Sequence, residues 1–178
     1  MSDHATFERR VLAHLDAGYN LARWLAQNGP DADDVLQDAC LRAMKYADSL
    51  RADDGRAWFL TIVRRSFYDW IARHRPAQLM RDEEAVLESM PDAAEGPEQA
   101  LSRKGDQLAL ADAVAALPPS FREVIVLREM EDLSYREIAR ITDVPVGTVM
   151  SRLSRARHLL RRCTALQGMA GAAKRQPP

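Results

Sequence analysis

The segment LSYREIARITDVPVGTVMSRLSRARHLLRR, residues 133–162, carries the pattern that decides the fold of the C-terminal part of the chain. Its apolar residues recur at helical spacing on both sides of TDVP, residues 142–145, which predicts two helices joined by a tight turn. Ser134 and Glu137 have the spacing of a capping box at the start of the first helix. The small residue Ala139 stands where the two helices would cross. The segment therefore predicts a helix-turn-helix.

The second helix of this motif has two different faces when it is projected at about 100° per residue. The apolar stripe, predicted to face the core, consists of Val149, Leu153, Ala156 and Leu160. The opposite side, predicted to face outward, consists of Thr148, Ser151, Arg152, Arg155, His158 and Arg162.

This outward side has the chemistry of a DNA-reading surface. Arginine forms bidentate hydrogen bonds with guanine, and Thr and Ser reach bases or phosphates. Residues near the start of such a helix lie deepest in the major groove. We therefore predict that Thr148, Ser151, Arg152 and Arg155 read bases, and we place Arg162 on the same DNA-binding surface. The alternative is a solvated basic face, but the preceding helix and the turn favour DNA.

An earlier helix, RAWFLTIVRRSFYDWIARHR at residues 56–75, combines basic and aromatic residues. Such a mixture suits single-stranded DNA, because charge follows the backbone and flat rings stack on bases. The residues predicted to bind DNA here are Trp58, Arg64, Arg65, Tyr68 and Arg75. The alternative is an amphipathic helix whose rings all lie in the core. We adopt that alternative for Phe67 and Trp70, and both possibilities stay open for Trp58 and Tyr68.

The N-terminal part predicts three helices, over residues 6–27, 31–47 and 55–75. Gly and Pro in NGP, residues 28–30, end the first helix, and Asp31 is predicted to cap the second. The apolar face of the second helix is predicted to consist of Leu36, Cys40, Met44 and Ala47. In LPPSFRE, residues 117–123, Ser120 and Glu123 have the spacing of a further capping box.

The chain length of 178 residues, 47% of them hydrophobic, suffices for two small domains. The formal net charge of −1 conceals opposite blocks. Residues 81–98 hold seven acids and one Arg, whereas residues 145–178 hold seven Lys or Arg and no acid. We predict an all-α protein with domains at 1–75 and 105–178, joined by a flexible acidic linker at 76–104. The tail after about residue 165 is predicted to be disordered.

Several function classes lack their sequence signals. The N-terminus does not have the layout of a signal peptide, and no apolar run has the length of a membrane span. The two cysteines, Cys40 and Cys163, are far apart and belong to no metal-binding spacing. No nucleophile–base pair or phosphate-binding glycine loop is recognisable. We therefore predict a cytoplasmic protein without a metal or cofactor, which is not an enzyme and does not insert into membranes.

Three stretches, residues 31–44 (DADDVLQDACLRAM), 56–75 and 117–157, together resemble the bacterial sigma-70 family. The short two-domain layout is similar to its extracytoplasmic-function (ECF) group. The resemblance implies an RNA polymerase sigma factor that recognises promoter DNA and aids its opening. It assigns the 56–75 helix to the −10 element and the helix-turn-helix to the −35 element. It assigns binding of core RNA polymerase to Asp34, Gln37, Asp38, Leu41 and Arg42.

The resemblance also places the acidic linker in the RNA exit channel of the polymerase and makes an anti-sigma factor a candidate partner. Four residues depart from common family choices: Arg65 for Asn, Met150 for Lys, Pro145 for Ser, and Asp143 where helix-turn-helix turns often have Gly. Two alternatives remain. One is an autonomous helix-turn-helix repressor or activator, which would dimerise on two half-sites. The other is an adaptor that binds only proteins.

Overall fold

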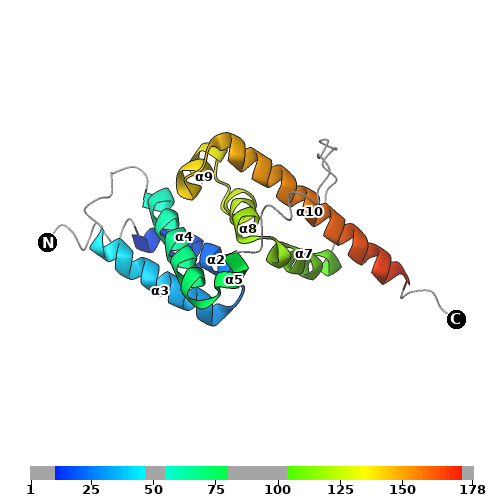
Figure 1. Ribbon diagram of the computed structural model, residues 1–178, viewed down its shortest axis with the longest axis horizontal. Helices are drawn as coiled ribbons and strands as arrows, with labels where there is room; N and C mark the ends of the chain where they lie inside the picture. The colour runs from blue at the N-terminus through cyan, green and yellow to red at the C-terminus, as the bar shows by residue number, and fades with distance from the viewer. Residues whose placement is uncertain (1–10, 47–54, 80–103, 174–178) are drawn as a thin grey trace.

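The computed structural model describes residues 11–46, 55–79 and 104–173, and every element in these ranges is a helix (Figure 1). The all-α prediction is therefore confirmed. The N-terminal half contains η1 (Leu12–His14), α2 (Leu15–Ala26), α3 (Gly29–Lys45), α4 (Gly55–His74) and α5 (Pro76–Leu79). The C-terminal half contains α7 (Lys104–Ala116), α8 (Pro119–Ile125), η3 (Val126–Met130), α9 (Tyr135–Thr142) and α10 (Val146–Ala173).

The turn between α2 and α3 is tighter than the sequence predicts. α2 ends at Ala26 and is followed by Gln27, whose φ of 68° is left-handed. The Asn28 side chain caps α3 by accepting a 2.9 Å hydrogen bond from the Asp31 backbone N–H. Gly29 and Pro30 therefore lie in the first turn of α3, where the missing N–H of proline costs nothing. The prediction that Asp31 is the cap was wrong.

The buried face of α3 is also rotated from the predicted one. The fully buried residues are Ala32, Val35, Ala39 and Ala43. Met44 is 53% exposed, while Leu36 and Cys40 pack only at the edge of the core. Alanines at the contact let α3 approach α2 and α4 closely. A helical projection that favours large apolar side chains underestimates these alanines and therefore predicts a different buried face.

The start of α8 corrects a second predicted cap. Pro118 is the N-cap residue, and it makes no side-chain capping hydrogen bond. Ser120 and Glu123 are buried within the helix and form no capping box, because Pro119 starts the helix before Ser120. By contrast, the predicted box at α9 is confirmed. Ser134 N–H donates to Glu137 at 2.8 Å, and Glu137 N–H donates to the Ser134 hydroxyl at 3.3 Å.

The helix-turn-helix is confirmed in its local geometry. α9 ends at Thr142 and is followed by Asp143 in a left-handed conformation with φ of 56°, which Asp tolerates better than most residues. The Pro145 carbonyl accepts the first hydrogen bonds of α10, from Thr148 and Val149. The predicted core stripe is buried at Val149, Leu153 and Ala156, with Leu160 packed at its edge.

α10 continues to Ala173 and passes the point at which the sequence predicts a disordered tail. The extension is rich in strong helix formers such as Ala165, Leu166 and Met169, and the next prolines are Pro177 and Pro178. In Figure 1 this end of α10 extends away from the other helices.

The two halves pack against each other. α8 lies between α2 and α10, and α9 lies on α4 (Figure 1). Buried apolar residues of both halves form one continuous cluster, which includes Leu25 and Phe59 from the N-terminal half and Phe121 and Ile138 from the C-terminal half. The predicted linker begins as α5 and ends at the start of α7, and its residues 80–103 lie outside the described ranges. Among the described helices, none is long and apolar enough to cross a membrane.

Candidate nucleic-acid interface

The outward side of α10 divides into residues on the surface and one residue turned inward. Ser151 and Arg162 are exposed, whereas Thr148 and Arg155 are half-buried. The Ser151 hydroxyl donates to the Thr148 carbonyl at 3.0 Å. Arg152 differs from them, because its side chain is 16% exposed and its guanidinium lies 3.7 Å from the Glu123 carboxylate of α8. The predicted outward position of Arg152 was therefore wrong for this conformation.

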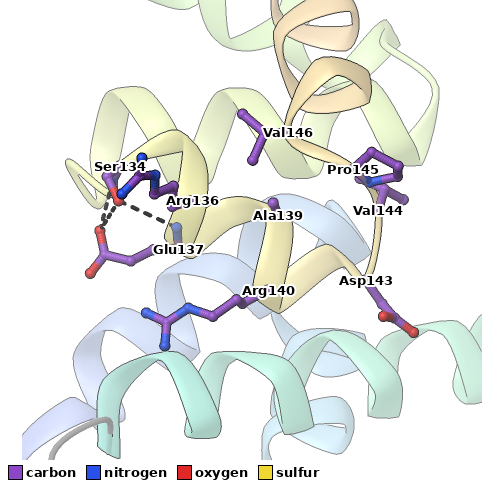
Figure 2. Close-up of a pocket in the computed structure, with 9 residues that line it drawn as sticks. All are labelled: Ser134, Arg136, Glu137, Ala139, Arg140, Asp143, Val144, Pro145 and Val146. Atoms are coloured by element: carbon purple, nitrogen blue, oxygen red, sulfur yellow. Dashed lines mark hydrogen bonds between the residues drawn. The ribbon is translucent and has the colours of Figure 1, made fainter.

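A surface groove runs between α9 and the start of α10. Figure 2 shows the apolar residues Ala139, Val144 and Val146 among those that line it, and the Arg140 side chain extending toward α4. The complete lining is Ser134, Arg136, Glu137, Ala139, Arg140, Asp143, Val144, Pro145 and Val146. The capping hydrogen bonds from Ser134 lower the pKa of Glu137, so this carboxyl is ionised at neutral pH. The groove is therefore lined by apolar residues and by charges of both signs.

The basic-aromatic face of α4 is only partly open. Arg65 is exposed, but the Arg64 side chain is 18% exposed and its Nε donates to Glu123 at 2.7 Å. The Arg64 guanidinium also lies 4.7 Å from the centre of the Tyr68 ring. Tyr68 and Trp58 are both half-buried and pack against the core cluster. This partial burial is compatible with both possibilities given by the sequence, a ring in the core and a ring that contacts DNA.

The remaining residues of α4 follow expectation more closely. Phe67 and Trp70 are buried, as predicted. Arg75, just after the end of α4, forms a 2.7 Å ion pair with Asp31 and lies 5.3 Å from the centre of the Trp70 ring. Arg75 therefore already ties α4 to the start of α3 in this conformation.

Glu123 is the residue at which both predicted DNA surfaces meet, and the sequence did not identify it as functional. Its side chain is fully buried, and both Arg64 of α4 and Arg152 of α10 lie beside its carboxylate. Burial raises the pKa of Glu123, and the two guanidinium groups oppose that rise. Burial also acts to lower the pKa of Arg64, but the Glu123 carboxylate outweighs it and the pKa is raised. Burial raises the pKa of Tyr68, as does the negative charge of Glu123, so the phenol is neutral.

The surface of α3 carries the residues predicted to bind core polymerase. Asp34, Gln37 and Leu41 are exposed, Leu41 by 62%. Asp38 pairs with Arg42 at 2.8 Å, and Arg42 also donates to Asp69 of α4 at 2.5 Å. The surface continues over two exposed residues, Met44 and Tyr46, that sequence reasoning did not assign to it. The exposed apolar patch beside acids is suited to binding another protein.

Metal-binding geometry is not found in the described residues, which contain no cluster of three His, Cys, Asp or Glu side chains. Cys40 is a free thiol whose pKa is raised by burial.

Two family models match the two halves separately. Sigma-70 region 2 matches residues 11–76, and sigma-70 region 4 matches residues 107–160. The ECF RNA polymerase sigma factor SigW of Bacillus subtilis is 31% identical over 169 residues, with 90% of this chain and 89% of SigW covered. The chain belongs to the ECF group of sigma-70 family RNA polymerase sigma factors.

Other relatives of this ECF sigma factor agree. RNA polymerase sigma factor SigV of Bacillus subtilis is 30% identical, with 85% of this chain and 86% of SigV covered. The ECF RNA polymerase sigma factor SigE of Mycolicibacterium smegmatis is 34% identical over 88% of this chain, which spans 60% of the length of SigE. Among solved structures, the sigma factor RpoE in complex with the anti-sigma factor NepR from Bartonella quintana fits with a TM-score of 0.68 and 28% identity. That fit covers 88% of this chain and 95% of RpoE, so it includes parts of both halves.

Proposed function

We propose that this ECF sigma factor is a dissociable initiation factor, which brings core RNA polymerase to specific promoters and helps to open the duplex there. The observation that carries the proposal is the pairing of two different DNA-type surfaces in one chain, matched by the two family models. α4 offers arginines beside aromatic rings, as an unpaired strand requires. α10 offers arginines and hydroxyls on the second helix of a helix-turn-helix, as a duplex major groove requires.

We assign the −10 element to the α4 surface, with Trp58, Arg64, Arg65, Tyr68 and Arg75 as its residues. We assign the −35 element to the α10 surface, with Thr148, Ser151, Arg152, Arg155 and Arg162 as its residues. In this proposal residues 1–75 form the domain that binds the −10 element, and residues 105–178 form the domain that binds the −35 element. In this structure Arg64 and Arg152 both lie beside the Glu123 carboxylate.

The α3 surface is proposed to bind core RNA polymerase through Asp34, Gln37, Asp38, Leu41 and Arg42. The acids keep this exposed apolar surface solvated in the free chain. A complementary protein can cover the surface at a small desolvation cost. Since a related sigma factor is solved with an anti-sigma factor, we propose a partner of that class for this chain also. These roles require a cytoplasmic protein without catalysis of its own.

Transcription reconstituted from purified parts tests the proposal. Core polymerase and this chain are incubated with genomic fragments, and the RNA 5′ ends are mapped. We expect discrete start sites that core polymerase alone does not produce. A repressor or activator that works without polymerase would instead bind palindromic duplexes as a dimer and would not change where core polymerase starts. An adaptor would leave start sites independent of template sequence.

A further inference from the structure

The start of α10 presents apolar side chains to solvent. Val146 is 38% exposed and Met150 is 53% exposed, although α10 buries a separate apolar stripe that begins at Val149. Val146 and Met150 are four residues apart, so they are neighbours along one side of the helix. Val144, in the turn before α10, lines the same groove as Val146 (Figure 2). Apolar surface therefore continues from the turn onto the first two turns of α10.

A second row of residues runs beside this apolar row. Gly147, Ser151 and Arg155 follow one another at intervals of four residues, and the first two are exposed. A Cβ at Gly147 would meet nothing within 4 Å, and the φ of Gly147 is not left-handed. The fold itself therefore does not require glycine at this position, where alanine would favour the helix. The missing side chain instead leaves room for another molecule to approach the α10 backbone closely.

The molecule expected at this place is the edge of a base pair, because the first residues of the second helix in a helix-turn-helix lie deepest in the major groove. Thymine is the base that carries a methyl group on this edge, whereas the other bases present hydrogen-bonding groups there. An apolar side chain gains by covering the methyl group. The same side chain leaves polar groups unsatisfied when it covers another base, so it favours thymine and disfavours the other bases.

A protein is the other kind of molecule that covers exposed apolar side chains. The charge of α10 favours DNA over a protein here. The helix contains five arginines and no acid, and one of these arginines, Arg155, continues the row of Gly147 and Ser151. A positively charged helix is suited to a polyanion, and its hydroxyl and guanidinium groups donate hydrogen bonds to bases and phosphates.

We propose that Val146 and Met150 select thymine in the −35 element by covering its 5-methyl group, and that Gly147 makes room for the base edges. The inference rests on the proposed function, because it requires α10 to lie in the major groove. It adds the class of base that the start of α10 selects. Arg155, more than one turn beyond Met150, then binds farther along the groove.

The test uses the complex of this chain with core polymerase and a promoter duplex whose RNA 5′ end has been mapped. Each thymine of the upstream element, on either strand, is replaced singly by deoxyuridine, which lacks only the 5-methyl group. Competition with the labelled parent duplex measures the affinity for each modified duplex. The measurement is repeated with Val146→Ala, Met150→Ala and Met130→Ala. Met130 is the matched control, because it is a 40% exposed methionine of η3 and lies outside α10.

We expect the parent chain to lose about fourfold in affinity for each methyl group removed at a position that Val146 or Met150 covers. Val146→Ala and Met150→Ala should each abolish one of these losses, because the side chain that covers the methyl group is then absent. Met130→Ala should retain all of them. Gly147→Ala should weaken binding to the unmodified duplex without lowering Tm, because the new Cβ meets DNA and no part of the chain.

Deoxyuridine losses of the same size in the parent chain, Val146→Ala and Met150→Ala would overturn the inference. An upstream element in which no thymine methyl group contributes to binding would overturn it as well. Met150→Ala that weakens assembly with core polymerase and leaves the deoxyuridine losses unchanged would show that the apolar residues bind protein instead.

A second measurement separates this inference from the proposed function. The chain alone is used to select duplexes from a pool of random sequence, and the bound fraction is sequenced. Enrichment of thymines that Met150→Ala removes and Met130→Ala retains would support the inference even if the polymerase complex produced no discrete start sites, a result that would contradict the proposed function. Selection without such thymines, or no selection of any sequence, would overturn the inference.

Discussion

Arg122 offers the sharpest test of how the halves are joined. Its buried guanidinium donates to the carbonyls of Leu25 at 2.8 Å and Trp24 at 3.4 Å, near the end of α2. It also donates to Leu117 at 2.7 Å and Ala115 at 3.0 Å, at the end of α7. One cation thus satisfies carbonyls at two helix ends that lack intrahelical partners. Burial lowers the pKa of Arg122 to about 10, so the side chain is charged at neutral pH.

Arg122→Met removes these donors and keeps an apolar stem of similar length. The Leu25 and Leu117 carbonyls are in buried hydrogen bonds, and each carbonyl left unsatisfied costs about 1–3 kcal/mol. The other two carbonyls are partly accessible and regain water. Since the desolvation cost of the guanidinium also disappears, we expect a net loss of about 3 kcal/mol in the free energy of unfolding. For a chain of this size that loss lowers Tm by about 6–12 °C.

Urea unfolding followed by circular dichroism, together with calorimetry, measures this loss. Arg128→Met is the control, because Arg128 donates to one carbonyl, that of Leu133, from a half-buried position. The control should lose about 1 kcal/mol or less. Equal losses from the two variants would refute the reasoning that Arg122 joins two helix ends. The loss of stability in Arg122→Lys should lie between the losses in Arg122→Met and Arg128→Met, because an ammonium group keeps the charge but lacks the planar fork of the guanidinium.

Three further outcomes are expected. Arg155→Ala should cost about 1–3 kcal/mol in binding to the preferred −35 element, measured with the polymerase complex, and equal losses on a scrambled element would reduce Arg155 to a phosphate contact. Asp38→Arg should weaken binding to core polymerase in a pull-down titration and change folding stability by less than about 1 kcal/mol, because its ion pair with Arg42 is partly exposed to solvent. Gly18→Ala should lower Tm, since a Cβ would lie 2.5 Å from the Phe59 ring. Gly29→Ala should leave Tm unchanged, because a Cβ there meets nothing within 4 Å. Similar Tm values for the two variants would argue against close packing of α2 on α4.

The helix-turn-helix could be predicted because its signals are local. The capping box at Ser134 and the left-handed position at Asp143 depend on residues a few positions apart, and helical spacing places Val149 in the core. Glu123 shows the limit of such reasoning. Its spacing from Ser120 imitates a capping box, but Pro119 moves the helix start and turns Glu123 toward the N-terminal half.

The packing of the two halves could not be predicted for a related reason. A helical projection gives the angle of Arg152 on α10, but it does not say which element lies opposite that angle. The contact between Arg64 and Glu123 joins residues 59 positions apart, and its partners carry no periodicity that links them. Sequence patterns thus indicate which residues are basic and surface-directed, while tertiary packing decides whether they face water or an acid.

The assignment of the two surfaces to two promoter elements is the central claim, and photo-crosslinking in the assembled polymerase–promoter complex tests it most directly. A photoreactive amino acid replaces Arg65 on α4 in one protein and Ser151 on α10 in another, since both positions are exposed. Asp112, an exposed position on α7, is the control. The account predicts crosslinks from position 65 near the start site and from position 151 about two helical turns upstream, roughly 70 Å away, with none from position 112. Crosslinks from positions 65 and 151 to the same element, or equally strong crosslinks without core polymerase, would contradict it.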